Sequence, residues 1–258
     1  MSTYFISDFH LGIPAALTSI EREKQICRWM DSIKHDADAI YFVGDMFDYW
    51  FEYRETIPRG YSRFFGKLAE LRDAQIPIYF FTGNHDMWMF DYFTKEFGIP
   101  VYRKPILRNI HNKKFFIGHG DGLGPDDYGY KFIKFVFAFK PFQWFFARLH
   151  PNFALCIMRF FSGKSRGAQN FEKETRFHGA DKERILVFAE TESKLQPDID
   201  FFIFGHRHLP IDWLLKNKKS RYINLGEWLY AKTYAVFDGH DITLKVFENE
   251  KVVIYKNS

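Results

Sequence analysis

Metal-ligand side chains recur in this chain directly after short runs of strand-forming residues. Five segments carry them in order: residues 8–10 (DFH), 44–48 (GDMFD), 83–86 (GNHD), 118–121 (GHGD) and 205–208 (GHRH). Each follows a run rich in Ile, Val, Phe and Tyr, such as residues 40–43 (IYFV) and 201–204 (FFIF). Such runs predict strands, and a rigid sheet can converge side chains from several strand ends on one point. The five segments together predict one composite site.

The donor types in these segments suit divalent metals. They comprise carboxylate, imidazole and amide groups without a thiolate: Asp8, His10, Asp45, Asn84, His119, His206 and His208. Imidazole nitrogen suits Mn, Fe or Zn, while carboxylate and amide oxygens suit harder ions such as Mn or Mg. A mixed oxygen and nitrogen set points away from a structural zinc site. Two cations roughly 3.5–4 Å apart would activate a bridging water and hold phosphoryl oxygens for in-line attack.

Each segment alone also has an ordinary structural interpretation. A histidine beside glycine is commonly a turn or core residue, and Asn-His-Asp sequences commonly form turns. The complete ordered set favours the metal site. His206 and His208 add to it, because residues i and i+2 of a strand share a face and both rings would then reach the same metals.

The order of the motifs resembles that of the calcineurin-like metallophosphoesterases, whose pattern is D-x-H, G-D-x-x-D, G-N-H-D/E, G-H and G-H-x-H. The resemblance runs from residue 8 to at least residue 208. It implies two metals bridged by Asp45, one held by Asp8, His10 and His208 and the other by Asn84, His119 and His206. It also implies that His85 lies beside the scissile phosphate, oriented by Asp86, with Asp48 supporting the ligands.

Strand and helix signals alternate along most of the chain, which predicts an α/β fold. Apolar residues recur with helical period in residues 18–34, 61–74 and 182–196, and extended runs occupy 211–215, 221–225, 233–237 and 242–247. We expect a four-layer α-β-β-α metallophosphoesterase sandwich of two mixed sheets. Residues 1–258 would form a single domain with an inserted helical cap at 126–173.

Residues 126–173 differ in composition from the rest of the chain. Residues 128–171 contain no acidic side chain, while basic residues and phenylalanines alternate densely, and Pro141 and Pro151 divide the segment into short helices. A helical hairpin packed on the core is one interpretation. We favour a cap that lines an acyl-chain pocket and rests on an anionic membrane surface. Nucleic acid is a less favoured ligand for the same composition.

A dimetal phosphoesterase with such a cap resembles the UDP-2,3-diacylglucosamine diphosphatases of lipid A synthesis. Residues 44–50, 119–123, 126–130 and 225–228 carry this resemblance. It implies hydrolysis of UDP-2,3-diacylglucosamine to UMP and 2,3-diacylglucosamine 1-phosphate, with Mn as the expected metal and Fe, Zn or Mg as alternatives. It places substrate contacts at Asp127, Ser165, Arg166 and Asn170. One departure is His85, because the best-known branch of that family has arginine there.

The sequence leaves two other functions open. One is a phosphoesterase acting on a soluble phosphodiester, nucleotide or nucleic acid, and the aromatic cap counts against it. The other is a non-catalytic binding module, which the complete donor set disfavours.

The remaining features bear on location and partners. The two cysteines suit a reducing compartment, and no stretch of about 18 or more residues is apolar and uncharged. A cleavable signal peptide is not expected because it would remove Asp8 and His10. We therefore expect a cytoplasmic enzyme associated peripherally with the inner face of the inner membrane through its cap. The expected partners are a nucleotide-sugar lipid and that membrane surface, and no protein partner is inferred.

Overall fold

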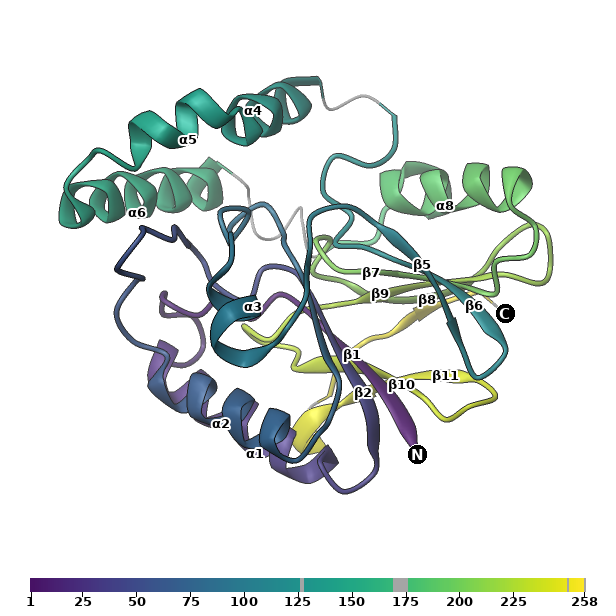
Figure 1. Cartoon of the computed structure of the whole chain (residues 1–258). Coiled ribbons are helices and arrows are strands. Elements are labelled where there is room, and N and C mark those ends of the chain that lie inside the picture. Colours follow the sequence, from purple (N-terminus) through teal and green to yellow (C-terminus); the bar gives the residue numbers. More distant parts are fainter. Residues whose placement is uncertain (126–127, 169–175, 250, 258) are drawn as a thin grey trace.

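Two mixed β-sheets lie face to face between helices in the computed structural model, which describes residues 1–125, 128–168, 176–249 and 251–257 (Figure 1). The first sheet has the order β11 (Ile242–Val246), β10 (Thr233–Phe237), β1 (Ser2–Ile6), β2 (Ala37–Val43), β3 (Ile78–Phe81) and β4 (Val101–Tyr102). The second has the order β12 (Tyr255–Lys256), β8 (Pro210–Leu214), β9 (Arg221–Leu225), β7 (Phe201–Phe204), β6 (Lys113–Ile117) and β5 (Ile106–Ile110).

The centre of each sheet is parallel. Strands β1 to β4 run parallel to one another, as do β6, β7 and β9. The chain therefore leaves these strands at the same edge of each sheet. Antiparallel pairs, such as β1 with β10 and β8 with β9, complete the sheets toward their sides. This topology places the ends of β1, β2, β3, β6 and β7 where their following loops can meet.

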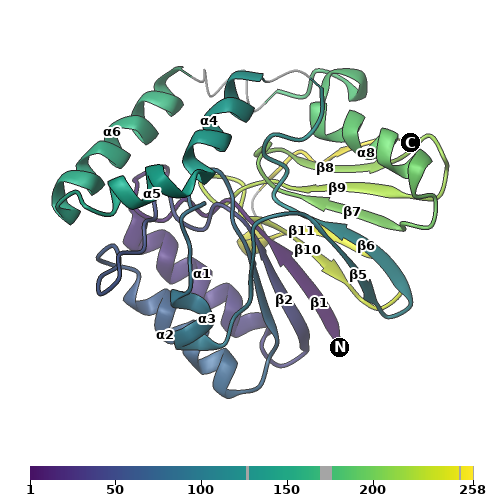
Figure 2. The same ribbon diagram turned by 45° about the horizontal axis from the view of Figure 1, so that its top comes forward.

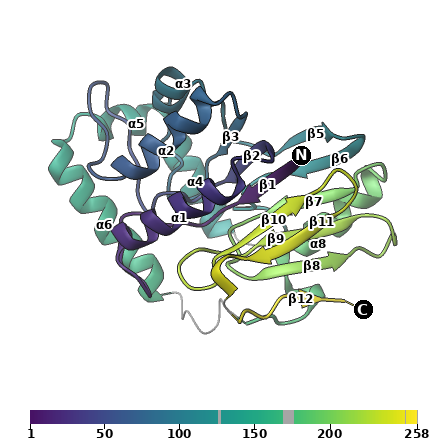
Figure 3. The same cartoon turned by 90° about the horizontal axis from the view of Figure 1, so that it is seen from below.

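Helices cover the outer face of each sheet. The helices α1 (Ser19–Ile33), α2 (Ser62–Asp73) and α3 (Tyr92–Phe97) pack on the first sheet, and α8 (Arg184–Leu195) with the short η1 (Ala180–Lys182) packs on the second. Seen from below, α1, α2 and α3 lie on the side of the molecule away from β8 and β12 (Figure 3). A short turn, η2 (Phe247–Asn249), follows β11. The expected four-layer α/β sandwich is confirmed.

Large apolar side chains fill the space between the layers. Phe5, Phe115 and Phe237 are fully buried between the two sheets, and the ring of Phe115 packs against the rings of the other two. On the outer face of the first sheet, Trp29 of α1 and Phe64 of α2 are fully buried. Burial of apolar surface on this scale is the main favourable term in folding. The layers therefore form a rigid base for the loops at the strand ends.

The helices expected from periodicity are present. The helix expected at 18–34 is α1, which begins after Thr18 with a reciprocal capping box to Glu21. Those expected at 61–74 and 182–196 are α2 and α8, and the four extended runs near the C-terminus are β8 to β11.

Three helices occupy the region of the predicted cap. They are α4 (Tyr128–Ala138), α5 (Lys140–Phe146) and α6 (Pro151–Ala168), and they lie together over one end of the sandwich (Figures 1 and 2). Pro141 lies in the first turn of α5, and Pro151 begins α6. We call α4, α5 and α6 the cap. Within the described part of the chain, no helix is both long and apolar enough to cross a membrane.

Candidate metal centre

Five loops at strand ends bring the predicted ligands together. Asp8 follows β1, Asp45 follows β2, Asn84 follows β3, His119 follows β6 and His206 follows β7. The first two loops are joined by backbone hydrogen bonds: the Asp8 N–H donates to the Gly44 carbonyl at 3.1 Å, and the His10 N–H donates to the Asp45 carbonyl at 3.0 Å. The expectation that strand ends converge these side chains is therefore confirmed.

Glycines at the start of these motifs allow the close approach. A Cβ atom on Gly44 would overlap the His119 ring, and one on Gly83 would overlap the Asp45 carboxylate. Glycine is required at both positions because any side chain would displace a predicted ligand.

Five of the predicted ligands have left-handed backbone conformations. The φ angles are 57° for Asp8, 45° for His10, 54° for Asp45, 67° for His206 and 55° for His208. Left-handed non-glycine residues are costly and gather at functional sites. The expectation that His206 and His208 lie within a strand is wrong, because β7 ends at Phe204. Both residues lie in the loop after it, where the positive φ angles curl the chain.

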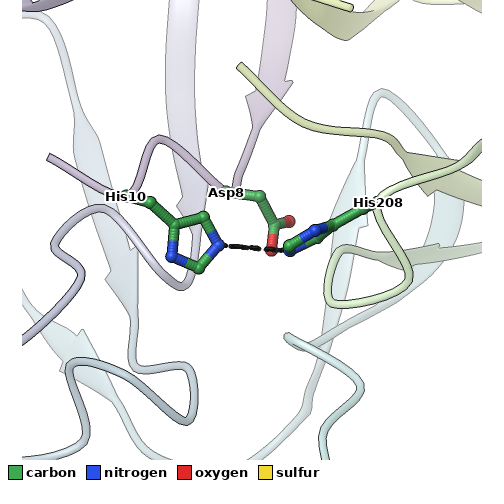
Figure 4. Close-up of side chains that lie close together, drawn as sticks. All are labelled: Asp8, His10 and His208. Carbon is green, nitrogen blue, oxygen red and sulfur yellow. Dashed lines mark hydrogen bonds and ion pairs between the residues drawn. The ribbon is translucent and has the colours of Figure 1, made fainter. Parts of the chain in front are cut away.

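One cluster of donors consists of Asp8, His10 and His208 (Figure 4). The Nε2 atoms of His10 and His208 are 3.1 Å apart, and His208 Nε2 is 3.2 Å from Asp8 Oδ1. Asp8 Oδ2 is held by the Ser7 hydroxyl at 2.5 Å and by the His206 N–H at 3.1 Å. One carboxylate oxygen is thus fixed by the protein, while the other is directed toward the two imidazoles.

A second cluster consists of Asn84, His119 and His206. Asn84 Oδ1 lies 2.9 Å from His206 Nδ1 and 3.3 Å from His119 Nε2. His119 Nδ1 lies 2.8 Å from the Val43 carbonyl. Since a carbonyl only accepts hydrogen bonds, that contact leaves His119 Nε2 directed at the cluster.

Asp45 lies between the two clusters. Its Oδ2 is 3.8 Å from His10 Nε2 and 3.3 Å from His119 Nε2. Its Oδ1 accepts a hydrogen bond from the His85 N–H at 2.9 Å. All seven predicted ligands therefore converge, with Asp45 in the position expected of a bridge.

The donors fit divalent cations. Asp8 Oδ1 is buried and accepts no hydrogen bond from any described residue, although His208 Nε2 is close by. Burial lowers the pKa of His206 to about 4, which favours the neutral ring that metals require. Burial also acts to lower the pKa of His119, but Asp45 beside it raises that pKa to about 10. A cation at Asp45 would replace this positive charge and release the proton.

His85 lies beside the first cluster, but its surroundings differ from the prediction. Its ring is 4.8 Å from that of His10, and its Nδ1 is 2.9 Å from the Asp48 carbonyl and 3.7 Å from Asp48 Oδ1. The carboxylate of Asp86 instead accepts hydrogen bonds from the Gly83 N–H at 2.7 Å and the Met46 N–H at 2.8 Å. The expectation that Asp86 orients His85 is therefore wrong. Asp86 ties two ligand loops together, and Asp48 orients the ring.

The four predicted substrate contacts fall outside the part of the chain whose side chains the structure describes. Asp127 and Asn170 lie outside the described residues. Ser165 and Arg166 belong to α6, but their side chains lie outside the description too.

Several supporting residues were not predicted from the sequence. Asp121 is buried two residues after His119, and its Oδ2 accepts hydrogen bonds from the Tyr130 hydroxyl and the Lys134 ammonium of α4, each at 2.6 Å. The Glu227 carboxylate accepts backbone N–H bonds from the following turn, and the Trp228 N–H donates to the Asp8 carbonyl at 3.0 Å. Residues 225–228 carry part of the family resemblance in the sequence, but the sequence alone gave no role for Glu227 or Trp228.

Comparisons with known proteins agree with this geometry. The calcineurin-like phosphoesterase family matches residues 1–210. In an alignment of 260 positions, the chain is 38% identical to a UDP-2,3-diacylglucosamine hydrolase of Porphyromonas gingivalis. The alignment covers 95% of this chain and 97% of that protein. The chain is also 29% identical over 234 residues to a UDP-2,3-diacylglucosamine hydrolase of Aeromonas hydrophila, covering 88% and 91%.

The fold also matches solved structures. A hypothetical protein of Pyrococcus horikoshii superposes with a TM-score of 0.50 at 9% identity, covering 96% of this chain and 88% of that one. At that identity the match concerns the fold alone. The family match, the relatives and the converging donors lead to one conclusion: this chain belongs to the calcineurin-like phosphoesterase family.

Proposed function

We propose that this chain is a metal-dependent hydrolase that cleaves the pyrophosphate bond of UDP-2,3-diacylglucosamine, releasing UMP and 2,3-diacylglucosamine 1-phosphate. The observation that carries the substrate is the 38% identity to a UDP-2,3-diacylglucosamine hydrolase over 95% of the chain, which includes most of the cap. The converging donors support the reaction type.

Two divalent ions would be held by the seven predicted ligands. Asp8, His10 and His208 would hold one, Asn84, His119 and His206 the other, and Asp45 would bridge them. When bound, the ions would activate a water molecule and neutralise the phosphoryl oxygens. We infer Mn²⁺ because the donors mix carboxylate, amide and imidazole, which Mn accepts more evenly than Mg or Zn does.

His85 would assist by contacting the phosphate. A carbonyl only accepts hydrogen bonds, so the contact with Asp48 places a proton on Nδ1 and leaves Nε2 as the atom available to substrate. Water would attack the UMP-side phosphorus, and the bond from that phosphorus to the bridging oxygen would break. Donation to a phosphate oxygen needs a second proton on Nε2, so His85 would act in its imidazolium form. The departing lipid phosphate is a good leaving group, so His85 would need only to donate a hydrogen bond and not to transfer that proton.

The cap would bind the lipid part of the substrate. Phe132, Phe135 and Phe145 are 67%, 69% and 66% exposed, far more than large apolar side chains of the layers below. A groove of about 510 Å³ lies between α5 and residues 51–56, lined by Phe51, Phe90, Trp144 and the basic Arg148 among others. Exposed aromatics beside basic groups suit a membrane interface. We infer peripheral attachment to the inner face of the inner membrane.

The proposal is tested by incubating purified protein with UDP-2,3-diacylglucosamine, Mn²⁺ and a nonionic detergent, alongside an EDTA-treated control. Mn²⁺-dependent release of UMP and the lipid monophosphate is expected. If the protein instead hydrolyses only a soluble phosphodiester such as bis-p-nitrophenyl phosphate, the metal chemistry stands but the substrate is wrong. One feature favours a soluble substrate. Residue 85 is a histidine, as in the general superfamily pattern, whereas the best-known branch of the diphosphatase family has arginine there.

A further inference from the structure

The cap reaches the metal centre through a polar contact that the proposed reaction does not use. Ser162 of α6 is buried, and its hydroxyl donates a hydrogen bond to Asp48 Oδ2. The other oxygen of that carboxylate, Oδ1, lies 3.4 Å from His10 Nδ1 and 3.7 Å from His85 Nδ1. Asp48 is itself almost completely buried. A single carboxylate thus connects the cap to a predicted metal ligand and to the predicted phosphate contact.

The register of α6 directs Ser162 at this carboxylate. Ala154, Met158 and Ser162 are spaced four residues apart and share one face of the helix. Ala154 is buried and Met158 half-buried in an aromatic cluster with Phe51 and Trp88. Ser162 is the polar end of this otherwise apolar stripe, and its hydroxyl meets the Asp48 carboxylate.

A second contact fixes α6 at the same place. Arg159 Nε donates a hydrogen bond to the Tyr49 hydroxyl at 2.9 Å, and its guanidinium lies 5.1 Å from the centre of the Tyr49 ring. Tyr49 follows Asp48 directly in the chain and is buried. Helix α6 therefore contacts two consecutive residues, Asp48 and Tyr49, of the loop that follows Asp45.

Carboxylates behind a metal-binding histidine fix the orientation of its ring and raise its affinity for the metal. A buried carboxylate also needs hydrogen-bond donors to keep its position. Ser162 supplies such a donor from the cap. If α6 moved away, Asp48 would lose that donor, and the rings of His10 and His85 would be held less firmly.

We propose that Ser162 is a positioning residue through which the seated cap orders the metal centre. Full metal affinity and turnover then require α6 to be docked, so that the centre is assembled most completely when the lipid-binding region is in place. This inference rests on the proposed two-metal reaction, but it does not depend on the identity of the lipid substrate.

Calorimetric titration of metal-free protein with Mn²⁺ tests the inference directly. Ser162→Ala is expected to weaken Mn²⁺ binding by roughly tenfold, the lower end of the usual loss for groups behind a metal ligand, and to lower kcat with it. Ser162→Thr keeps the hydroxyl and should retain both. Cys156→Ala is the matched control, since Cys156 is exposed on the same helix.

A double-mutant cycle with Asp48→Ala, which removes the acceptor of the Ser162 hydroxyl, separates positioning from general damage to the cap. If Ser162 acts through Asp48, then Ser162→Ala changes Mn²⁺ affinity less than about twofold in the Asp48→Ala background. The inference is overturned if Ser162→Ala binds Mn²⁺ as the Cys156→Ala control does, or if its effect is undiminished when Asp48 is alanine. Should the alanine variant unfold, Ser162→Cys carries the same expectation with the volume kept.

Failure of the inference is distinguishable from failure of the proposed function. If the wild-type chain does not hydrolyse UDP-2,3-diacylglucosamine, the substrate is wrong, yet the Mn²⁺ titrations still decide the role of Ser162. If the substrate is hydrolysed and Ser162→Ala is indistinguishable from wild type, only the inference fails.

Discussion

The metal centre and the cap are neighbours in this molecule that are held in place by different forces. The centre is fixed by short polar contacts, such as the Asp86 carboxylate that accepts N–H bonds from Gly83 and Met46. The cap is fixed mainly by aromatic packing. The centre of the Phe146 ring lies 4.7 Å from that of Trp88 and 4.9 Å from that of Phe51. Buried polar networks specify one geometry, whereas apolar packing tolerates adjustment. The proposed metal chemistry and the proposed lipid binding thus lie in separate regions.

The largest expected effect comes from removing metal. Dialysis against EDTA should abolish hydrolysis, because the residues of the centre have no other source of a hydroxide nucleophile near neutral pH. Binding to detergent micelles should persist, since the cap's exposed aromatics do not involve the centre. Activity and micelle co-elution are measured on the same sample, and Mn²⁺ is then added back. Loss of micelle binding on metal removal would contradict the separation of the two regions.

Asp45→Ala should lower turnover by on the order of 10³-fold or more, since metal ions supply several kcal/mol of transition-state stabilisation. Asp45 lies near histidines of both clusters, so its loss would affect both of the proposed ions. Initial rates at saturating Mn²⁺ measure the effect. Asp73→Ala, an exposed aspartate at the end of α2, is the control for removing a carboxylate. Wild-type activity in Asp45→Ala would rule out the two-metal mechanism.

His85→Ala should lower kcat by about 10²-fold, the lower end of the range for a positioned acid or base, and leave Mn²⁺ binding nearly unchanged. The reason is that His85 lies beside the first cluster without belonging to the seven ligands. His85→Arg should recover part of the activity, because arginine also donates to phosphate oxygens. A larger loss of metal affinity than of kcat would make His85 a ligand instead.

The smallest effect is expected in the cap. Changing Phe132 and Phe135 to serine should weaken binding to anionic vesicles by about tenfold or more, since each ring would be only partly buried at the interface and would contribute less than the roughly 1.5–3 kcal/mol of full burial. Mn²⁺ affinity should not change. Vesicle sedimentation with phosphatidylglycerol measures the first quantity and calorimetry the second. Unchanged vesicle binding would favour a cap that is simply a helical hairpin packed on the core.

The convergence of the seven donors could be predicted because the information for it is local. Each predicted ligand follows a strand by a few residues, so a motif and a strand signal suffice to place Asp8, Asp45 or His119. The same reasoning failed for His206 and His208, since their left-handed backbone depends on the surrounding loops. It also failed for Asp86, whose partners Gly83 and Met46 belong to two loops whose packing no local pattern reveals.

In the cap, the helices could be predicted from the sequence, but a contact between the cap and the metal centre could not. The cap helices could be predicted from prolines and composition, because both act within a few residues. The contact between Ser162 and Asp48 joins positions 114 residues apart, and a serine in an apolar helix carries no sign of its partner. Short elements such as α3 and β4 were likewise not predicted, since their packing on the first sheet, rather than a pattern of their own, stabilises them.

Hydrolysis in ¹⁸O-labelled water tests the central claim most directly. Purified protein, Mn²⁺ and UDP-2,3-diacylglucosamine are incubated in the labelled solvent, and both products are examined by mass spectrometry. Attack by a metal-activated water on the UMP-side phosphorus predicts one labelled oxygen in UMP and none in the lipid monophosphate. Label in the lipid monophosphate, or no Mn²⁺-dependent UMP at all, would contradict the proposed reaction.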